Sequence, residues 1–391
     1  MKERLKLLWL ASWYPGKISA FNGDFIKRHA EAVSLFADVQ VVHFAKDGNG
    51  AITHSIKIEE SHKGSLKETI IYYYSPGIGI ASRFFAEIKF RKIAKGFIDK
   101  IIVTEKPDIV HVHVGMKCGL IADWVKKKFK IPYVVTEHWT GLPEESIDNF
   151  SSLPAIRRSQ WKRILKNADA VTAVSQYLAA ALKKRFAIEP VVIPNVVDTG
   201  IFYPEQVKQN ADPNFIFIST FDDFKNPDMV LKAFAGILAK ARNARLTIFA
   251  PDKLVAVKRC AELGIEKNVY CSGEVPQTEL AKFIKQSDAL LLYSSYETFG
   301  CVVIEANAAG VPVLVSNIPA MRELVTDRVN GLLINPASVQ QLTEAMIAFS
   351  GIRESFDKEK IAEVTAEKFN YKIVGKQFVD LYQQLINKAR C

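Results

Sequence analysis

Short hydrophobic runs alternate with helical stretches along the first half of this 391-residue chain. Buried strands are predicted at LKLLWLASW (5–13), DVQVVHFA (38–45), TIIYYY (69–74), PDIVHVHVG (107–115), IPYVVTEHW (131–139), ADAVTAVS (168–175) and EPVVIPN (189–195). Helical patterns fill the intervals, beginning with DFIKRHAEAVSLF after the first strand. Buried strands that alternate with helices predict an α/β domain in which helices cover both faces of a parallel sheet.

The same alternation restarts after residue 195. Strands are predicted at PNFIFIST (213–220), ARLTIFA (244–250), NVYCSG (268–273), ALLLYSS (289–295), VPVLVS (311–316) and GLLINP (331–336). We therefore predict an N-terminal domain over 1–193 and a second domain over 194–371, both doubly wound, with a C-terminal helix over 372–391 that crosses back onto the first. Ligands of such sheets bind beyond the carboxyl ends of the strands, so two facing sheets would form a deep cleft.

Composition and spacing exclude several classes of protein. No apolar run reaches the roughly 18–20 residues of a membrane-spanning helix, and the basic start MKERLKLLWL continues as a strand, so we expect no signal peptide. The five cysteines are scattered and odd in number, which favours free thiols in the cytoplasm. The seven histidines lack a metal-binding spacing such as HExxH, so no metal is expected.

Positive charge is concentrated in the first half of the chain. Residues 1–190 hold 30 Lys and Arg against 19 Asp and Glu, whereas the remainder holds 52 − 30 = 22 against 42 − 19 = 23. This asymmetry indicates an anionic partner for the first half; a solvated basic surface is the alternative.

The segment SSYETFGCVVIEANAAG (294–310) carries the most specific chemistry. It predicts a loop with Glu297 after a buried strand, then a helix that opens at Gly300 and carries Glu305 in its second turn. Backbone N–H groups at a helix N-terminus suit a diphosphate, and carboxylates suit sugar hydroxyls. A nucleotide sugar fits this arrangement. Alternatively, one acid supports the helix dipole and the other is a buried, paired acid.

Further candidates follow other predicted strands. Gly23 precedes a helix and permits close approach of a phosphate, although an ordinary strand–helix turn also needs such a residue. Lys225 follows a strand and can reach a phosphate as a point charge, or is a surface lysine. His111 and His113 lie in one strand, where we expect one to face the packing of the sheet and the other the strand end. His113 is the better candidate for the cleft, and His138 is a third.

Taken together, these motifs resemble the retaining GT-B glycosyltransferases of family four, the group that includes bacterial mannosyl- and glucosyltransferases. The resemblance covers most of the chain and is strongest over 195–336, where PNVVDTGIFYP and the E-x7-E element Glu297–Glu305 match the family. PDIVHVHVG is similar to the strand that carries the family's active-site histidine.

The resemblance implies a role for each matching position. Glu297 would bind the donor sugar, Glu305 the ribose, and Lys225 the leaving phosphate, with His113 beside the transferred sugar. The implied catalytic residues are Glu297, His113 and Lys225; the donor-binding residues are Gly23, Thr220, Lys225, Glu297, Phe299, Gly300, Cys301, Val302 and Glu305, and the candidate acceptor-side residues are His111 and His138. No cofactor or metal is implied. Two departures stand out: Ser219-Thr220 replaces the family's usual Gly-Arg pair before the lysine, and the first loop keeps only Gly23 of a common double glycine.

The expected activity is retaining transfer of a hexose from a UDP- or GDP-sugar to a hydroxyl of a glycan or lipid-linked acceptor, in cell-surface polysaccharide or glycolipid synthesis. The alternatives are a catalytically weak nucleotide-sugar-binding subunit, a GT-B sugar-nucleotide epimerase and a phosphorylase with pyridoxal phosphate. A dinucleotide-dependent dehydrogenase is least favoured because GxGxxG is absent.

The stretch RFFAEIKFRKIAKGFIDK (83–100) interleaves aromatic and basic residues, and VKKKFK (125–130) adds four lysines. An interfacial helix on anionic lipid at the inner face of the cytoplasmic membrane is one interpretation; a helix whose apolar face packs on the sheet is the other. No nucleic-acid-binding module is recognised.

Overall fold

The computed structural model describes residues 4–143, 149–206, 211–336 and 338–390. The chain divides into two compact units: unit 1 contains Met1–Asn195 and Tyr371–Cys391, and unit 2 contains Val196–Asn370. The domain boundaries expected from the sequence, after 193 and after 371, lie within two residues of these limits.

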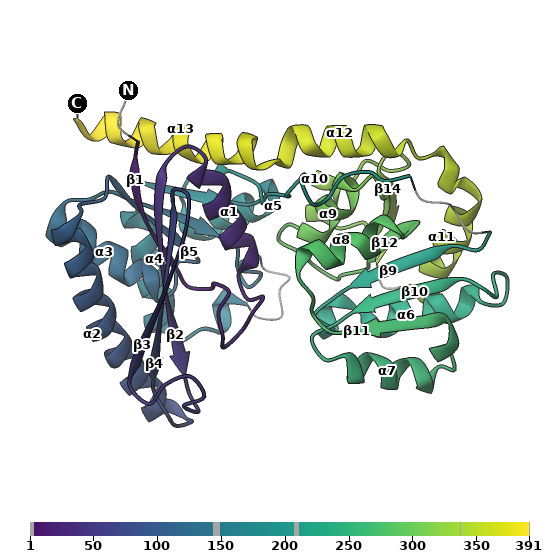
Figure 1. Cartoon of the computed structure of the whole chain (residues 1–391), viewed down its shortest axis with the longest axis horizontal. Coiled ribbons are helices and arrows are strands. Elements are labelled where there is room, and N and C mark those ends of the chain that lie inside the picture. The colour runs from purple at the N-terminus through teal and green to yellow at the C-terminus, as the bar shows by residue number, and fades with distance from the viewer. Residues whose placement is uncertain (1–3, 144–148, 207–210, 337, 391) are drawn as a thin grey trace. The chain divides into compact units, whose positions relative to one another are not determined.

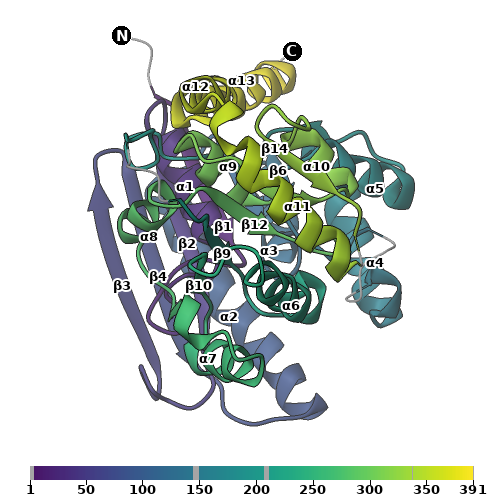
Figure 2. The same ribbon diagram turned by 90° about the vertical axis from the view of Figure 1, so that its right-hand side faces the viewer.

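Unit 1 is built on an eight-stranded sheet with the order β3-β4-β2-β1-β5-β6-β7-β8. Its strands are β1 (Lys6–Ala11), β2 (Asp38–Asp47), β3 (Ile56–Lys63), β4 (Leu66–Tyr74), β5 (Ile109–His113), β6 (Tyr133–Glu137), β7 (Ala170–Ala173) and β8 (Val191–Val192). Neighbouring strands are parallel except β3, which pairs antiparallel with β4 at the outer edge (Figure 2). The sequence prediction missed β3, because an exposed edge strand lacks a buried apolar run.

Helices cover both faces of this sheet. They are α1 (Asp24–Ser34), α2 (Ile80–Thr104), α3 (Cys118–Phe129), α4 (Ala155–Asn167), α5 (Gln176–Phe186) and α13 (Tyr371–Arg390). The C-terminal helix α13 packs against α1 on one face, while α2, α3 and α4 lie on the other (Figure 1).

Unit 2 has a six-stranded, wholly parallel sheet with the order β11-β10-β9-β12-β13-β14. Its strands are β9 (Asn214–Ile218), β10 (Arg245–Phe249), β11 (Val269–Ser272), β12 (Ala289–Leu292), β13 (Val313–Ser316) and β14 (Gly331–Ile334). Its helices are α6 (Pro227–Ile237), α7 (Lys253–Glu262), α8 (Gln277–Lys285), α9 (Cys301–Ala308), α10 (Pro319–Leu324), α11 (Val339–Ile352) and α12 (Lys358–Phe369). Helices α6 and α7 lie on one face, and α8, α9 and α10 on the other (Figure 1).

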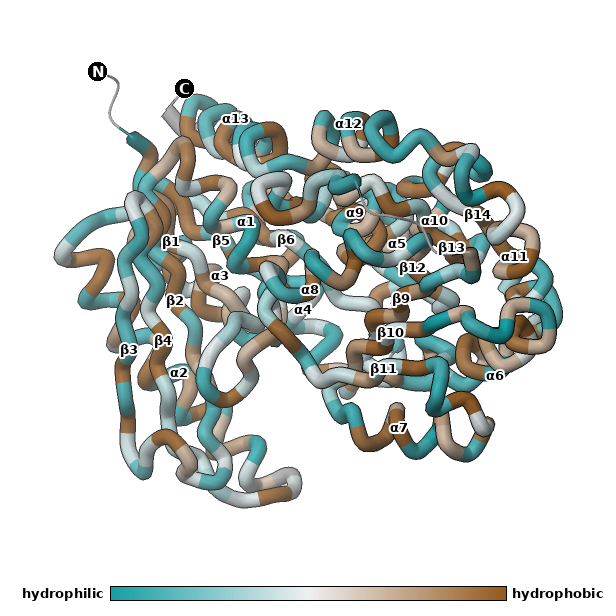
Figure 3. The backbone as a smooth tube through the Cα atoms, turned by 45° about the vertical axis from the view of Figure 1, so that its right-hand side comes forward, coloured by the Kyte–Doolittle hydropathy of each residue, from teal (hydrophilic) through white to brown (hydrophobic). Residues whose placement is uncertain are grey.

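The apolar strands form the cores because both faces of a parallel sheet are covered by helices. In unit 1, Trp9 and Leu10 of β1 are fully buried, as are Phe215 and Phe217 of β9 in unit 2. Figure 3 shows hydrophobic residues along β9 and β10, whereas the edge strand β3 is largely hydrophilic. Among the described residues, no helix combines the length and apolar character needed to cross a bilayer.

Candidate active site

In unit 2, the loop from β12 to α9 has the form that the sequence predicts. Gly300 precedes α9 with φ +95°, a conformation that L side chains rarely adopt. A Cβ atom there would lie 2.7 Å from Cε of Met321, the flexible end of a side chain that can shift, so the positive φ is the stronger reason for glycine. This conformation allows the chain to turn sharply into α9, whose N-terminus favours an anion.

Glu297 in this loop forms an ion pair with Lys225, 72 residues earlier in the chain. The side chain of Glu297 is 7% exposed and that of Lys225 17%. Ser294 Oγ donates a hydrogen bond of 2.8 Å to the same carboxylate oxygen, Oε1. The structure therefore brings the predicted sugar-binding carboxylate and the predicted phosphate-binding cation into direct contact.

Asn226 ties the Lys225 loop to the β12 end, a role that sequence reasoning missed. Its Nδ2 atom donates to the Tyr293 carbonyl at 2.9 Å and to Ser295 Oγ at 3.0 Å. The backbone adds a hydrogen bond from the Ser295 N–H to the Phe224 carbonyl, 2.7 Å long. The position of Lys225 beside Glu297 therefore depends on the backbone path of two loops.

The remaining predicted donor residues of unit 2 differ in exposure. Glu305 lies within α9, is 2% exposed and accepts a hydrogen bond of 3.2 Å from Gln277 Nε2. Phe299 is buried and packs edge-on against Phe369. Thr220 is exposed, and Cys301 and Val302 are half-buried in the first turn of α9.

Gly23, the predicted phosphate-contacting glycine of unit 1, caps the N-terminus of α1 with φ +75°. A Cβ atom at this position would lie 2.6 Å from the carbonyl carbon of Trp13. Glycine is therefore required by the path of the loop itself, whether or not a ligand approaches.

His111 and His113 lie in β5 and point to the same face of the eight-stranded sheet, because residues two apart in a strand share a face. Their surroundings nevertheless differ as expected, because His111 lies in the packing of the sheet whereas His113 ends the strand beside His138. His111 is fully buried, and its ring nitrogens lie 2.6 Å from Tyr382 Oη and 2.7 Å from Thr136 Oγ1. Both nitrogens are thus used inside the unit, which does not support a role for His111 on the acceptor side.

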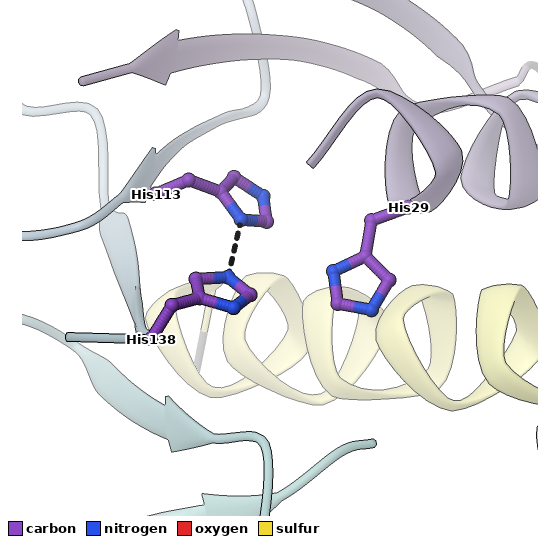
Figure 4. A group of neighbouring side chains, drawn as sticks. All are labelled: His29, His113 and His138. Atoms are coloured by element: carbon purple, nitrogen blue, oxygen red, sulfur yellow. Dashed lines mark hydrogen bonds between the residues drawn. The ribbon is translucent and has the colours of Figure 1, made fainter. Parts of the chain in front are cut away.

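His113 contacts His138, with 3.2 Å between Nδ1 of the first ring and Nε2 of the second. Burial holds the pKa of both side chains well below the ordinary value, so both are neutral near pH 7. A third buried ring, His29 of α1, lies beside them (Figure 4). His29 lies in a helix, far in sequence from His113 and His138, and no motif around it would have identified it from the sequence.

Glu137, the last residue of β6, is another group that the sequence analysis missed. It is fully buried, and its Oε1 atom accepts hydrogen bonds of 2.9 Å from the Gly115 N–H and from Trp161 Nε1. Desolvation raises the pKa of this carboxyl group to about 7. It is therefore one of the described groups that titrate close to neutral pH.

Unit 1 also contains a cavity of about 1130 Å³. Its aromatic lining residues are Trp13, Tyr14, Phe44, Tyr72, Phe84, Trp139 and Trp161. The cationic lining residues are Lys46, Arg83, Arg91, Lys117 and Arg157, against one acid, Glu87, which pairs with Arg91. The Trp139 and Trp161 rings stack with centroids 4.7 Å apart. The cavity thus combines an aromatic wall with an excess of positive charge.

The two interpretations of the basic helix α2 apply to different parts of it. Phe90, Ala94 and Ile98 are buried, and the Phe90 ring packs edge-on against Phe44 of β2, as the packing interpretation predicts. At the beginning of the helix, however, Phe84 and Phe85 are 62% and 67% exposed. The lysine run at 125–130 is a separate case, because Lys126, Lys127 and Lys128 form ion pairs with acids of the same unit.

Comparisons with known proteins match both units. The model of the family described as "Glycosyltransferase Family 4" matches residues 38–200, and that of "Glycosyl transferases group 1" matches residues 202–363. The alpha-monoglucosyldiacylglycerol synthase of Streptococcus pneumoniae is 25% identical over 321 residues, which cover 76% of this chain and 72% of that protein.

Two solved structures resemble the whole chain. Sucrose-phosphate synthase from Thermosynechococcus elongatus has a TM-score of 0.78 and 19% identity, and covers 98% of this chain and 100% of its own. Anabaena HepE in complex with UDP and glucose has a TM-score of 0.70 and 14% identity, and covers 97% of this chain and 100% of its own. At these identities the likeness concerns the fold, and it confirms the prediction of two Rossmann-like domains.

Proposed function

Because the chain belongs to the family-four glycosyltransferases and has their GT-B fold, we propose that it transfers a hexose from a nucleoside diphosphate sugar to an acceptor hydroxyl. The donor is a UDP- or GDP-sugar, the acceptor is a glycan or lipid-linked glycan, and the anomeric configuration is retained. The observation that carries this proposal is the contact between Lys225 and Glu297 beside the glycine-initiated N-terminus of α9.

The proposed donor site is assigned from the charged groups around Lys225, Glu297 and the N-terminus of α9. The diphosphate binds at the α9 N-terminus, where backbone N–H groups and the helix dipole favour negative charge. Lys225 then exchanges its contact with Glu297 for a phosphate oxygen, which frees the carboxylate to accept hydrogen bonds from sugar hydroxyls. Glu305, deeper in the helix, holds the ribose hydroxyls. The approach of Gly23 to the diphosphate stays a prediction.

The chemistry follows from the same groups. As the bond between the sugar and the phosphate breaks, negative charge develops on the leaving diphosphate. Lys225 and the oriented backbone dipoles stabilise that charge, which is electrostatic preorganisation. The role of His113 beside the transferred sugar stays a prediction. The acceptor hydroxyl attacks from the face that the diphosphate leaves. No metal is assigned a step in this reaction.

The cavity of unit 1 is the proposed acceptor site. Its volume of about 1130 Å³ exceeds the roughly 300–1,000 Å³ of common small-molecule pockets, so it accommodates more than a single sugar. Aromatic side chains suit a sugar ring or a lipid chain, and the five cations suit a phosphate or carboxylate on the same acceptor. An amphiphilic, anionic glycolipid satisfies both features, and one relative bears the name of a glycolipid synthase.

We further propose that unit 1 docks on anionic membrane lipid. Phe84 and Ile88 line the cavity and are also exposed, as is the neighbouring Phe85. Arg83, exposed beside them, adds a charge that attracts anionic headgroups. A lipid-linked acceptor would then reach the cavity without leaving the bilayer surface.

Calorimetry with nucleoside diphosphates and nucleotide sugars tests the donor site. Glu305→Gln is expected to weaken both kinds of ligand, because both contain ribose. Glu297→Gln is expected to weaken the nucleotide sugar more than the free diphosphate. Glu344→Gln, which changes an exposed acid of α11, is the matched control. Identical effects of the two site variants on both ligands would refute the division of roles.

A transfer assay with a panel of nucleotide sugars and lipid-linked acceptors tests the activity itself. Glu297→Ala is expected to lose nearly all transfer while remaining folded. Binding of the donor without any transfer would instead favour a catalytically weak nucleotide-sugar-binding subunit. Analysis of the anomeric configuration of the product tests retention, and an inverted product would contradict it.

A further inference from the structure

Three histidines from separate segments of unit 1 converge at one point. His29 comes from α1, His113 ends β5, and His138 directly follows β6. One ring nitrogen of each lies within 4.8 Å of the corresponding nitrogens of the other two. The rings are 0%, 0% and 5% exposed, so water competes little with any ligand at this point. Figure 4 shows the His29 ring facing the other two.

Hydrogen bonding fixes the tautomer of His29. Its Nε2 atom lies 3.0 Å from the Pro194 carbonyl oxygen, which can only accept, so Nε2 carries the proton and donates it. Nδ1 therefore presents a lone pair. This atom is buried and has no hydrogen-bond partner in the part of the chain that the structure describes, and Figure 4 shows it on the side of the ring that faces His113 and His138.

An imidazole whose second nitrogen donates to a backbone carbonyl is the arrangement of a metal-ligating histidine. Burial also lowers the pKa of His29 to about 3, so the ring is neutral at physiological pH. Metal ligands must be unprotonated at the coordinating atom. His29 therefore meets both requirements before any metal is present.

The other two nitrogens have the spacing that a tetrahedral ion requires. Nδ1 of His113 and Nε2 of His138 are 3.2 Å apart. Two nitrogens bound to zinc at about 2.0–2.1 Å with tetrahedral angles lie about 3.3 Å apart. A hydrogen bond between these two rings leaves Nδ1 of His29 without a partner among the described residues, whereas a bound cation would coordinate that atom as well. The His29 nitrogen needs to move inward by on the order of 1 Å to reach the same spacing.

We propose that His29, His113 and His138 form a binding site for a borderline transition-metal ion of the Zn²⁺ or Co²⁺ class, with a fourth position for water or another ligand. Three neutral imidazoles suit such ions, whereas Mg²⁺ and Ca²⁺ prefer oxygen ligands. The bound ion occupies Nδ1 of His113. If the proposed function is correct and His113 acts beside the transferred sugar, the ion therefore inhibits sugar transfer.

The test uses the purified full-length protein after treatment with a chelator. Co²⁺ is expected to bind in a 1:1 ratio with visible ligand-field absorption, and Zn²⁺ is expected to displace it. His29→Gln is expected to weaken Co²⁺ binding by at least about 100-fold, because one of three ligands is lost. His62→Gln removes an exposed histidine and is expected to bind Co²⁺ as the wild type does.

Thermal unfolding of His29→Gln without metal shows whether the variant is folded, and His138→Gln provides a second variant with the same expected loss of binding. A near-ultraviolet thiolate charge-transfer band would show that cysteines bind the metal, and would overturn the proposal. Equal Co²⁺ affinity of the wild type and both variants would also overturn it.

A transfer assay distinguishes metal binding at the three histidines from the proposed inhibition of sugar transfer. Zn²⁺ at saturation is expected to suppress transfer by the wild type and to leave transfer by His29→Gln unchanged. Binding of Zn²⁺ without loss of transfer would support the site and refute the inhibition. If neither protein transfers sugar under any condition, the proposed function fails, and the spectroscopic result alone decides the metal site.

Discussion

The buried carboxyl group of Glu137 gives a pH dependence of stability that one substitution removes. Glu137→Gln keeps the size of the side chain and an oxygen that can accept from the Gly115 N–H and Trp161 Nε1. The substitution removes the carboxyl group that binds and releases the proton. Because desolvation raises the pKa of Glu137 from 4.5 to about 7, the wild type folds most favourably when this group is protonated.

The sign follows from the two pKa values. Below pH 4.5 both the folded and the unfolded chain bind this proton, and the stability it contributes is fully present. Between 4.5 and about 7 only the folded chain retains it, so stability is lost as the pH rises. A shift of about 2.5 pKa units, at about 1.4 kcal/mol for each unit, gives a total loss of about 3 kcal/mol.

Buried histidines act in the opposite direction. Desolvation lowers the pKa of His29 to about 3 and that of His43 to about 4, so these groups contribute stability that is lost as the pH falls below 6.5. Wild type and Glu137→Gln share these histidines. The difference in free energy of unfolding between the two proteins therefore isolates Glu137.

Urea unfolding of both proteins at a series of pH values between about 5 and 8 measures this difference. Relative to its value at about pH 5, the difference is expected to move in favour of Glu137→Gln by about 2–3 kcal/mol by pH 8. Glu344→Gln, which replaces an exposed acid, is expected to show no such trend. A difference between wild type and Glu137→Gln that stays constant across the series would refute the reasoning.

Three further predictions concern the ion pair, metal and membrane. Lys225→Met leaves the nearly buried carboxylate of Glu297 without its cation, and it is expected to lower the free energy of unfolding by on the order of 2 kcal/mol. Urea unfolding measures this loss, and the double variant Lys225→Met/Glu297→Gln should recover part of it. Transfer activity is expected to survive EDTA, and a loss restored by Mg²⁺ or Mn²⁺ would contradict this prediction. Wild-type protein is expected to cosediment with anionic but not neutral vesicles, less so at high salt. Replacing Phe84 and Phe85 with Ser should weaken that binding, whereas Val103→Ser, at the other, exposed end of α2, should not.

Local patterns in the sequence determined most of the elements. The apolar runs became the central strands β1, β5, β9 and β12, because a strand covered on both faces must be hydrophobic throughout. Gly300 opens α9 as predicted, since the sharp turn requires a positive φ. The edge strand β3 escaped prediction because an exposed strand has no such requirement.

Contacts between distant segments were decided by the tertiary structure alone. The sequence singles out Lys225 and Glu297 separately, each in its own loop, but their ion pair depends on the adjacent order of β9 and β12 in the sheet. In the same way, α1, β5 and β6 bring His29, His113 and His138 together.

What the sequence alone determined was therefore most of the strands and helices, the twofold division of the chain and the turn at Gly300 into α9. What only the tertiary structure decided was which side chains share an environment. Periodicity reports whether a residue is buried, but the neighbours of a buried side chain depend on strand order and helix packing, which bring together residues far apart in the chain. The pKa of Glu137 and the convergence of the histidines both arise from that packing.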